Sequence, residues 1–264
     1  MSKLQEEFLR RAARQKRKVT LLRVLLFVLL IAAWETATRL EWMDSFIFSS
    51  PSRIVLCFVQ MVKNHMIFYH IGITLGETFL SFLLVIIIGI LLAILLWWKE
   101  TIAQVLEPYL VVLNSLPKTA LAPVFIVWLG NNMKTIIVAA VSVAVFSTTI
   151  TLYNTFLEME PEKIKMIKTL GGTKKDVLLK LILPGNIPAI ISAMKVDIGL
   201  TLVGVIIGEF VAAKAGLGYL IIYGSQVFKL DYVLLSIVIL CLISTGLYLL
   251  ISFIEKCYSR HYAH

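Results

Sequence analysis

The sequence predicts an all-α polytopic membrane protein with six transmembrane helices and with both termini in the cytoplasm. Of its 264 residues, 59% are hydrophobic and only 16% are charged, and the mean hydropathy is +0.90. A soluble domain carries nearer a quarter of charged residues. Several apolar stretches are also long enough to cross a hydrocarbon core ~30 Å thick. A single segment in that core can form all its backbone hydrogen bonds only as a helix.

The apolar stretches define six expected spans. They lie at about residues 19–38, 70–98, 103–129, 134–157, 187–212 and 231–255. The first span follows a basic stretch and could also be a secretory signal peptide, but its long apolar core and the five later spans favour a retained anchor. Residues 1–18 are expected to form a cytoplasmic basic helix that touches anionic lipid, and residues 19–264 a single transmembrane domain.

Lysine and arginine indicate the orientation in the membrane. They gather at the N-terminus, at Lys99, in residues 158–185 and at the C-terminus, and these segments all face the cytoplasm if the chain starts there. The net charge of +9 is therefore attributed to topology, and no nucleic-acid partner is expected. The three cysteines are scattered without metal-ligand or paired spacing, so neither a disulfide nor a metal site is predicted.

Two of the segments between the spans carry helix signals. In residues 49–64, Ser50 can cap a helix whose first turn holds Pro51, and this amphipathic helix is expected on the outer surface. Residues 158–185 are expected to form two short cytoplasmic helices joined at Gly171-Gly172. In the first helix Ile164, Ile167 and Leu170 recur every three residues, which predicts one apolar face. A Thr173–Asp176 capping box opens the second helix, which is apolar almost all round and therefore expected to be buried. Pro184 and Pro188 are expected to break the chain before the fifth span.

The cytoplasmic segment has two interpretations. It can be an ordinary helical hairpin, or it can be a docking surface. Its Gly171 is followed, after nine residues, by Leu181-Ile182-Leu183-Pro184, and this spacing resembles the cytoplasmic signature of the membrane subunits of ABC-type importers. The E-A-A positions of that signature read Lys165-Met166-Ile167, which departs from the pattern.

Three other stretches extend the resemblance to nearly the whole chain. "LNSLPKTALAPVFIVWLG" (113–130), "GVIIGEFVAAKAGLGYLI" (204–221) and "FSSPSRIV" (48–55) resemble segments of the nitrate/taurine/sulfonate branch of these permeases. The resemblance implies the type I ABC importer permease (MetI-like) fold and a bacterial cytoplasmic-membrane location. It further implies that residues 158–185 couple the chain to a cytoplasmic ATPase subunit. The residues implied in this coupling are Glu162, Ile164, Lys165, Ile167, Lys168, Leu170, Gly171, Gly172, Leu183 and Pro184.

The resemblance also implies the partners. They are two ATPase subunits, a second permease copy that most simply makes a homodimer, and an extracytoplasmic substrate-binding protein. No cofactor is expected on this chain, because ATP and Mg²⁺ would bind the ATPase subunit. The branch carries small anions and heterocyclic nutrients, and the sequence does not choose among them.

Polar residues within the spans are candidates for a translocation pathway or gate. Lys118 lies between Pro117 and Pro123, where a broken helix could line a cavity; the alternative is that Lys118 caps freed backbone carbonyls. Glu209 is expected to act at a gate or an interface, or to pair with a cation such as Lys214. The pathway and gate candidates are Asn114, Ser115, Lys118, Thr119 and Glu209.

Other functional classes are less favoured. The chain has no phosphate-binding loop, HExxH or GxSxG motif, so it is not expected to be an enzyme. A secondary transporter would also use broken helices and intramembrane charges, but would not need the 158–185 segment. A membrane scaffold without an ATPase partner is the third alternative.

Overall fold

The computed structural model describes the backbone of residues 3–262 and the side chains of residues 14–258. This part of the chain is helical and contains no β-strand. In chain order the helices are α1 (Lys3–Arg39), α2 (Ser45–Phe48), α3 (Pro51–Lys63), α4 (Met66–Trp98), α5 (Glu100–Ser115), α6 (Lys118–Leu129), α7 (Met133–Leu157), α8 (Pro161–Thr169), α9 (Lys174–Val177), the π-helix η1 (Leu178–Ile182), α10 (Leu183–Gly185), α11 (Ile187–Ala212), α12 (Leu217–Gln226) and α13 (Leu230–Tyr262).

Among these helices, five are long and apolar enough to cross a membrane. They are Arg14–Arg39 within α1, the helices α4, α7 and α11, and Leu230–Tyr258 within α13. The predicted span over 103–129 consists of two helices, α5 and α6, bent by 96° at a short break. The break occurs because Leu116 precedes Pro117 and is held in an extended conformation (φ −61°, ψ 139°), which ends α5. Counted as one broken span, the pair brings the total to six.

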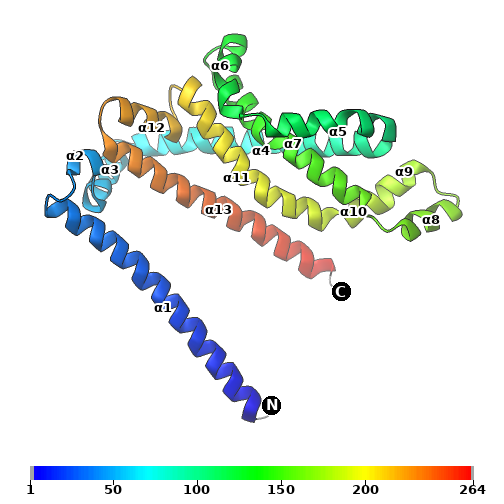
Figure 1. Ribbon diagram of the computed structural model, residues 1–264, viewed down its shortest axis with the longest axis horizontal. Coiled ribbons are helices and arrows are strands. Elements are labelled where there is room, and N and C mark those ends of the chain that lie inside the picture. Colours follow the sequence, from blue (N-terminus) through cyan, green and yellow to red (C-terminus); the bar gives the residue numbers. More distant parts are fainter. Residues whose placement is uncertain (1–2, 263–264) are drawn as a thin grey trace.

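The core of the bundle is the packing of α4, α7 and α11 (Figure 1). Glycines let the backbones of α7 and α11 approach closely. A Cβ placed on Gly204 would lie 2.6 Å from Cα of Ala140, and one on Gly208 would lie 2.8 Å from Cα of Ile136. In the same interface the hydroxyl of Thr148 donates to Asp197 Oδ1 at 2.8 Å. Asp197 is therefore part of the helix packing.

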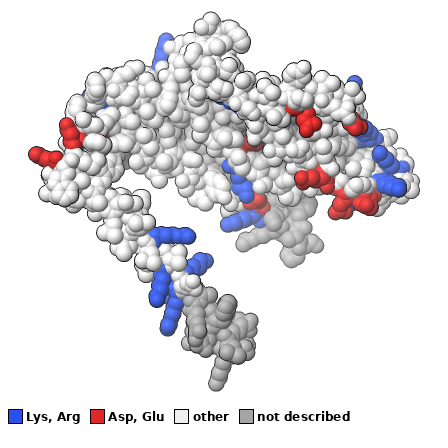
Figure 2. All heavy atoms as spheres, viewed as in Figure 1, with Lys and Arg blue, Asp and Glu red and all other residues white. Residues whose placement is uncertain are grey.

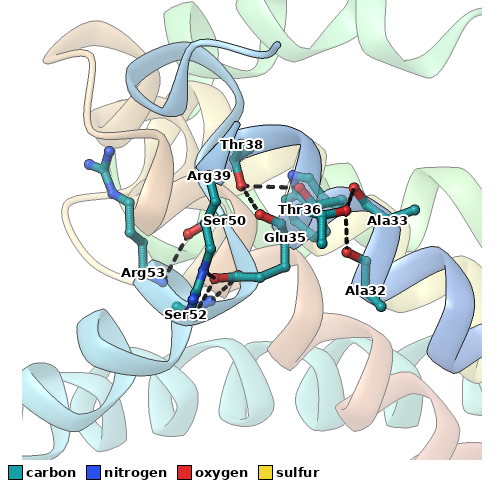
Figure 3. A network of polar contacts seen from close by, with 10 residues as sticks. Ala32, Ala33, Glu35, Thr36, Thr38, Arg39, Ser50, Ser52 and Arg53 are labelled. Carbon is teal, nitrogen blue, oxygen red and sulfur yellow. Dashed lines mark hydrogen bonds and ion pairs between the residues drawn. The ribbon is translucent and has the colours of Figure 1, made fainter. Parts of the chain in front are cut away.

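Helix α1 projects away from the rest of the molecule (Figure 1). None of the apolar window of α1 is buried, and the described contacts of α1 are mainly with α2 and α3. The end of α1 is held by Glu35, whose carboxylate accepts from the Ser52 hydroxyl at 2.7 Å and from Arg39 Nε at 2.8 Å (Figure 3). The predicted start of α3 is confirmed, because Ser50 caps it and Pro51 is its first residue.

Candidate functional site

The two ends of the bundle carry different groups of polar residues. At one end lie α3 and α12, and at the other lie α8, α9 and the C-terminal end of α4 (Figure 1). Charged side chains are sparse over the middle of the face shown in Figure 2 and gather along α1 and around α8 and α9. By the distribution of lysine and arginine, the end with α8 and α9 is cytoplasmic.

The cytoplasmic segment is built as two helical pieces around a glycine turn, as predicted. Gly171 has φ +81°, which a residue with a side chain rarely adopts, and it ends the turn after α8. A Cβ on Gly172 would lie 2.8 Å from the carbonyl oxygen of Ile167, so the turn folds tightly back on α8. The capping box is present: the Thr173 N–H donates to Asp176 Oδ2 at 2.9 Å, and the Asp176 N–H donates to the Thr173 hydroxyl. Hydrogen bonds from Lys180 and then Thr173 hold the pKa of Asp176 below its usual range.

The second piece differs from the prediction in two ways. Leu179 is exposed, so that only one face of the piece is buried, with Val177 and Ile182 fully inside. Pro184 does not break the chain, because it lies within a continuous helical run in which η1 passes directly into α10. The π-helix η1 precedes it, and the turn to α11 comes at Asn186, whose side-chain amide donates to the Ile182 carbonyl at 2.8 Å.

The apolar face predicted for α8 is divided in the structure. Ile164 and Ile167 pack against the chain's own inner cluster, which includes Phe156 and Val177. Leu170, in contrast, is 80% exposed, and Met166 is 61% exposed. The outward surface of the segment, here called the α8 patch, is therefore Met166 and Leu170. The charged residues predicted for this site, Glu162, Lys165 and Lys168, are exposed beside it.

The α5–α6 break brings the predicted pathway residues together. Asn114, Ser115 and Thr119 are exposed, and the ammonium of Lys118 donates to the backbone carbonyl of Asn114. Of the two alternatives for Lys118, this contact matches the capping of a freed carbonyl, and the same lysine stays half-buried at the edge of the break. Irregular backbone at membrane depth is tolerated where protein covers it or water lines it, and this break is uncovered in the single chain.

Glu209 lies at the other end of the bundle and is 1% exposed. Its carboxylate does not pair with Lys214. It accepts from the Thr74 hydroxyl at 2.7 Å, from the Gly218 N–H at 2.6 Å and from the Tyr219 N–H at 3.3 Å. Because the first N–H groups of a helix lack partners within it, Glu209 serves as the cap of α12.

Two residues of α4 complete this cap. The Gly216 N–H donates to Nδ1 of His70 at 3.0 Å, and the Leu217 N–H donates to the Thr74 hydroxyl at 2.8 Å. Gly216 has φ +120°, and a Cβ there would overlap the Glu209 carboxylate. Four consecutive N–H groups, 216 to 219, are thus bound by side chains of α4 and α11. We call His70, Thr74 and Glu209 the α12 cap.

Sequence reasoning identified Glu209 but missed His70 and Thr74. The available signal was their spacing, since His70, Thr74 and Glu77 recur at four and three residues on one face of an apolar helix. All three are buried, which is uncommon for polar groups unless they have a structural or functional role.

Comparison with known proteins identifies the chain. The family described as binding-protein-dependent transport system inner membrane component matches residues 85–261. The chain belongs to this family. Its relatives are ABC transporter permeases, which are membrane subunits and not themselves enzymes, and the secondary-transporter and scaffold interpretations are thereby set aside.

Three relatives of the permease illustrate the range of the family. It is 31% identical to a probable ABC transporter permease protein of Haemophilus influenzae, over 88% of this chain and 94% of that protein. It is 28% identical to the formylaminopyrimidine transport permease of Halalkalibacterium halodurans, over 74% of this chain and 77% of that protein. It is 25% identical to a putative aliphatic sulfonates transport permease of Bacillus subtilis, over 92% of this chain and 88% of that protein. The predicted branch is confirmed by these matches.

The permease also has the fold of a solved importer. A chain of the MetNI methionine ABC transporter, in inward-facing conformations, superposes with a TM-score of 0.65 at 18% identity. The match covers 74% of this permease and 97% of that chain. At this identity the likeness establishes the fold alone, which is the type I importer permease fold predicted from the sequence.

Proposed function

We propose that this permease couples to a separate ATPase subunit through the α8 patch, and that it forms the translocation pathway with a second permease copy. The observation that carries the coupling proposal is the exposure of Met166 and Leu170 at the cytoplasmic end. Large apolar side chains in a water-facing turn are a feature of docking surfaces. The exposed lysines beside the patch favour a partner groove with an acidic rim.

The α5–α6 break supports the proposed pathway. It leaves Asn114, Ser115 and Thr119 exposed, beside the half-buried Lys118. A second copy, related by two-fold symmetry, would enclose these groups between the two chains and shield the irregular backbone from lipid. An extracytoplasmic binding protein would deliver the substrate to this pathway.

The proposed substrate class is a small organic anion or a heterocyclic nutrient. The support is the names of the relatives, which transport formylaminopyrimidine or aliphatic sulfonates, together with the cationic Lys118 at the break. Purification of the associated binding protein with its natural ligand, followed by mass spectrometry of the released ligand, tests this class directly.

The coupling proposal predicts the behaviour of a Leu170→Glu variant. Burying a leucine in an interface contributes about 1.5–3 kcal/mol, so its loss is expected to weaken ATPase binding roughly 10- to 100-fold. Leu170 is 80% exposed in the permease, so the free energy of unfolding of the permease alone should change by less than about 0.5 kcal/mol. The measurement is the amount of ABC ATPase that co-purifies with the tagged permease from its own membranes.

Leu170→Met is the matched control, because it keeps an apolar side chain of similar volume at the same site. It should retain the ATPase. Equal retention of the ATPase by Leu170→Glu and Leu170→Met would contradict the proposal, as would a wild-type permease that carries no ATPase at all.

A further inference from the structure

Lys174 connects the cytoplasmic segment to the end of α4. It is the first residue of α9, and its Nζ donates to the carbonyl oxygen of Trp98 at 2.6 Å. Trp98 is the last residue of α4, where the final carbonyls of a helix have no partner within it. The ammonium therefore meets both an unsatisfied acceptor and the negative end of the helix dipole.

The same ammonium lies over two aromatic rings. Nζ of Lys174 is 5.4 Å from the ring centroid of Trp97 and 5.8 Å from that of Trp98. The two indoles are arranged edge to face, with centroids 6.5 Å apart. Trp97 also packs on the inner cluster that receives Ile164 and Ile167 from α8. One lysine thus links the docking segment to the α4 terminus through a hydrogen bond and two cation–π contacts.

The opposite end of α4 carries the α12 cap. His70 and Thr74 lie in its first turns and bind the N–H groups of Gly216 and Leu217. Between the two ends α4 is one continuous helix of 33 residues, about 50 Å long at 1.5 Å per residue. The helix is held by directional polar contacts at both ends, on the cytoplasmic segment at one and on α12 at the other.

We propose that Lys174 is the positioning residue that transmits movement of the cytoplasmic segment along α4 to α12. The inference rests on the proposed coupling of the α8 patch to an ATPase. The apolar contacts of the segment with α4 can slide, whereas the Lys174 bond to the Trp98 carbonyl fixes the register between the two elements. Displacement of α9 by the ATPase then moves α4 lengthwise, and the α12 cap carries that movement to the outer end.

The test detects movement at α12, at the outer end of α4, while the substitution is made at Lys174, at the inner end. Cys241 and Cys257 are exposed and are replaced by alanine. Cys57 is kept, because it is buried away from the label and burial raises the pKa of its thiol to about 11. An environment-sensitive fluorophore is attached to Ser225→Cys, an exposed position in α12. The labelled permease is assembled with its ATPase subunits carrying a hydrolysis-blocking substitution, and the emission is compared before and after addition of ATP and Mg²⁺.

Three variants distinguish positioning from folding. Lys174→Met keeps the apolar stem but removes the charge and the donor, and it is expected to reduce the ATP-induced emission change at least fivefold. Lys174→Arg keeps both and should restore it. Lys175→Met, one residue on, removes an exposed lysine without a partner among the described residues and should behave like the parent protein.

Two outcomes would overturn the inference. One is an unchanged ATP response in Lys174→Met, and the other is the absence of any ATP response in the parent protein with its ATPase bound. If Lys174 had a merely structural role, Lys174→Met would have a lower thermal stability or would bind less ATPase than the parent protein. Under the proposal, the thermal stability and the amount of bound ATPase are the same in Lys174→Met and in the parent. Failure of the proposed function is distinct, because then no ATPase binds the parent permease.

Discussion

Replacing Glu209 by alanine is expected to destabilise the permease by at least about 3 kcal/mol. The variant leaves the Gly218 N–H, the Tyr219 N–H and the Thr74 hydroxyl without their acceptor, and each unsatisfied buried donor costs about 1–3 kcal/mol. The measurement is thermal unfolding in mild detergent, followed by the fluorescence of the five tryptophans. A loss of this size lowers the midpoint by roughly 6–12 °C in a chain of this length.

Two further variants test whether the capping geometry is responsible. Glu209→Gln keeps one acceptor oxygen but turns an NH₂ group towards N–H donors, so its effect should lie between those of the parent and of alanine. Glu107→Ala removes an exposed glutamate of α5 and should shift the midpoint little. Equal midpoints for Glu209→Ala and Glu107→Ala would show that the carboxylate does not hold α12.

Replacing Gly204 by valine is expected to force α7 and α11 apart. The new Cβ would lie 2.6 Å from Cα of Ala140, and because the neighbour is backbone, no side-chain rotation can relieve the overlap. The separation would also break the Thr148–Asp197 hydrogen bond and leave the Asp197 carboxylate buried without it. Overpacking alone costs about 1–3 kcal/mol, so the combined loss should approach the upper end of that range or exceed it.

Gly199→Val is the matched control for this change. Gly199 lies on the same helix, but a Cβ there would meet nothing within 4 Å. The same valine should therefore be tolerated at 199 and not at 204, as measured by unfolding midpoint and by the fraction of monodisperse protein in gel filtration. A similar loss at both positions would attribute the effect to valine in α11 rather than to contact with α7.

The sequence predicted the spans well because hydropathy is a local and additive property. Residues 103–129 pass the same hydropathy test as one broken span. Pro117 holds Leu116 in an extended conformation there, and the broken helix expected around Lys118 is found at that place. The local backbone signals of the cytoplasmic segment, Gly171 and the Thr173–Asp176 box, were also predictable, because each acts within four residues.

The sequence did not predict which residues of the apolar face of α8 would be buried and which would be exposed. The spacing of Ile164, Ile167 and Leu170 defined an apolar stripe, but only the tertiary structure turns the two isoleucines inward and leaves Leu170 outside with Met166. The partners of Glu209 were equally hidden, because they are backbone groups of a turn and a threonine far away in the sequence. Charge alone suggested Lys214 as the partner of the Glu209 carboxylate, whereas in the structure that carboxylate accepts from the backbone N–H groups of Gly218 and Tyr219.

The α12 cap has a consequence for the insertion of the protein into the membrane during its synthesis. α4 leaves the ribosome well before α11 and α12 exist, yet His70, Thr74 and Glu77 on its surface are buried in the finished molecule. Until Glu209 and the turn at Gly216 are synthesised, His70 and Thr74 would face lipid or the lining of the insertion machinery without the groups that they bind in the folded protein. Final docking of α4 in the bilayer therefore waits until this part of the C-terminal third of the chain has been made.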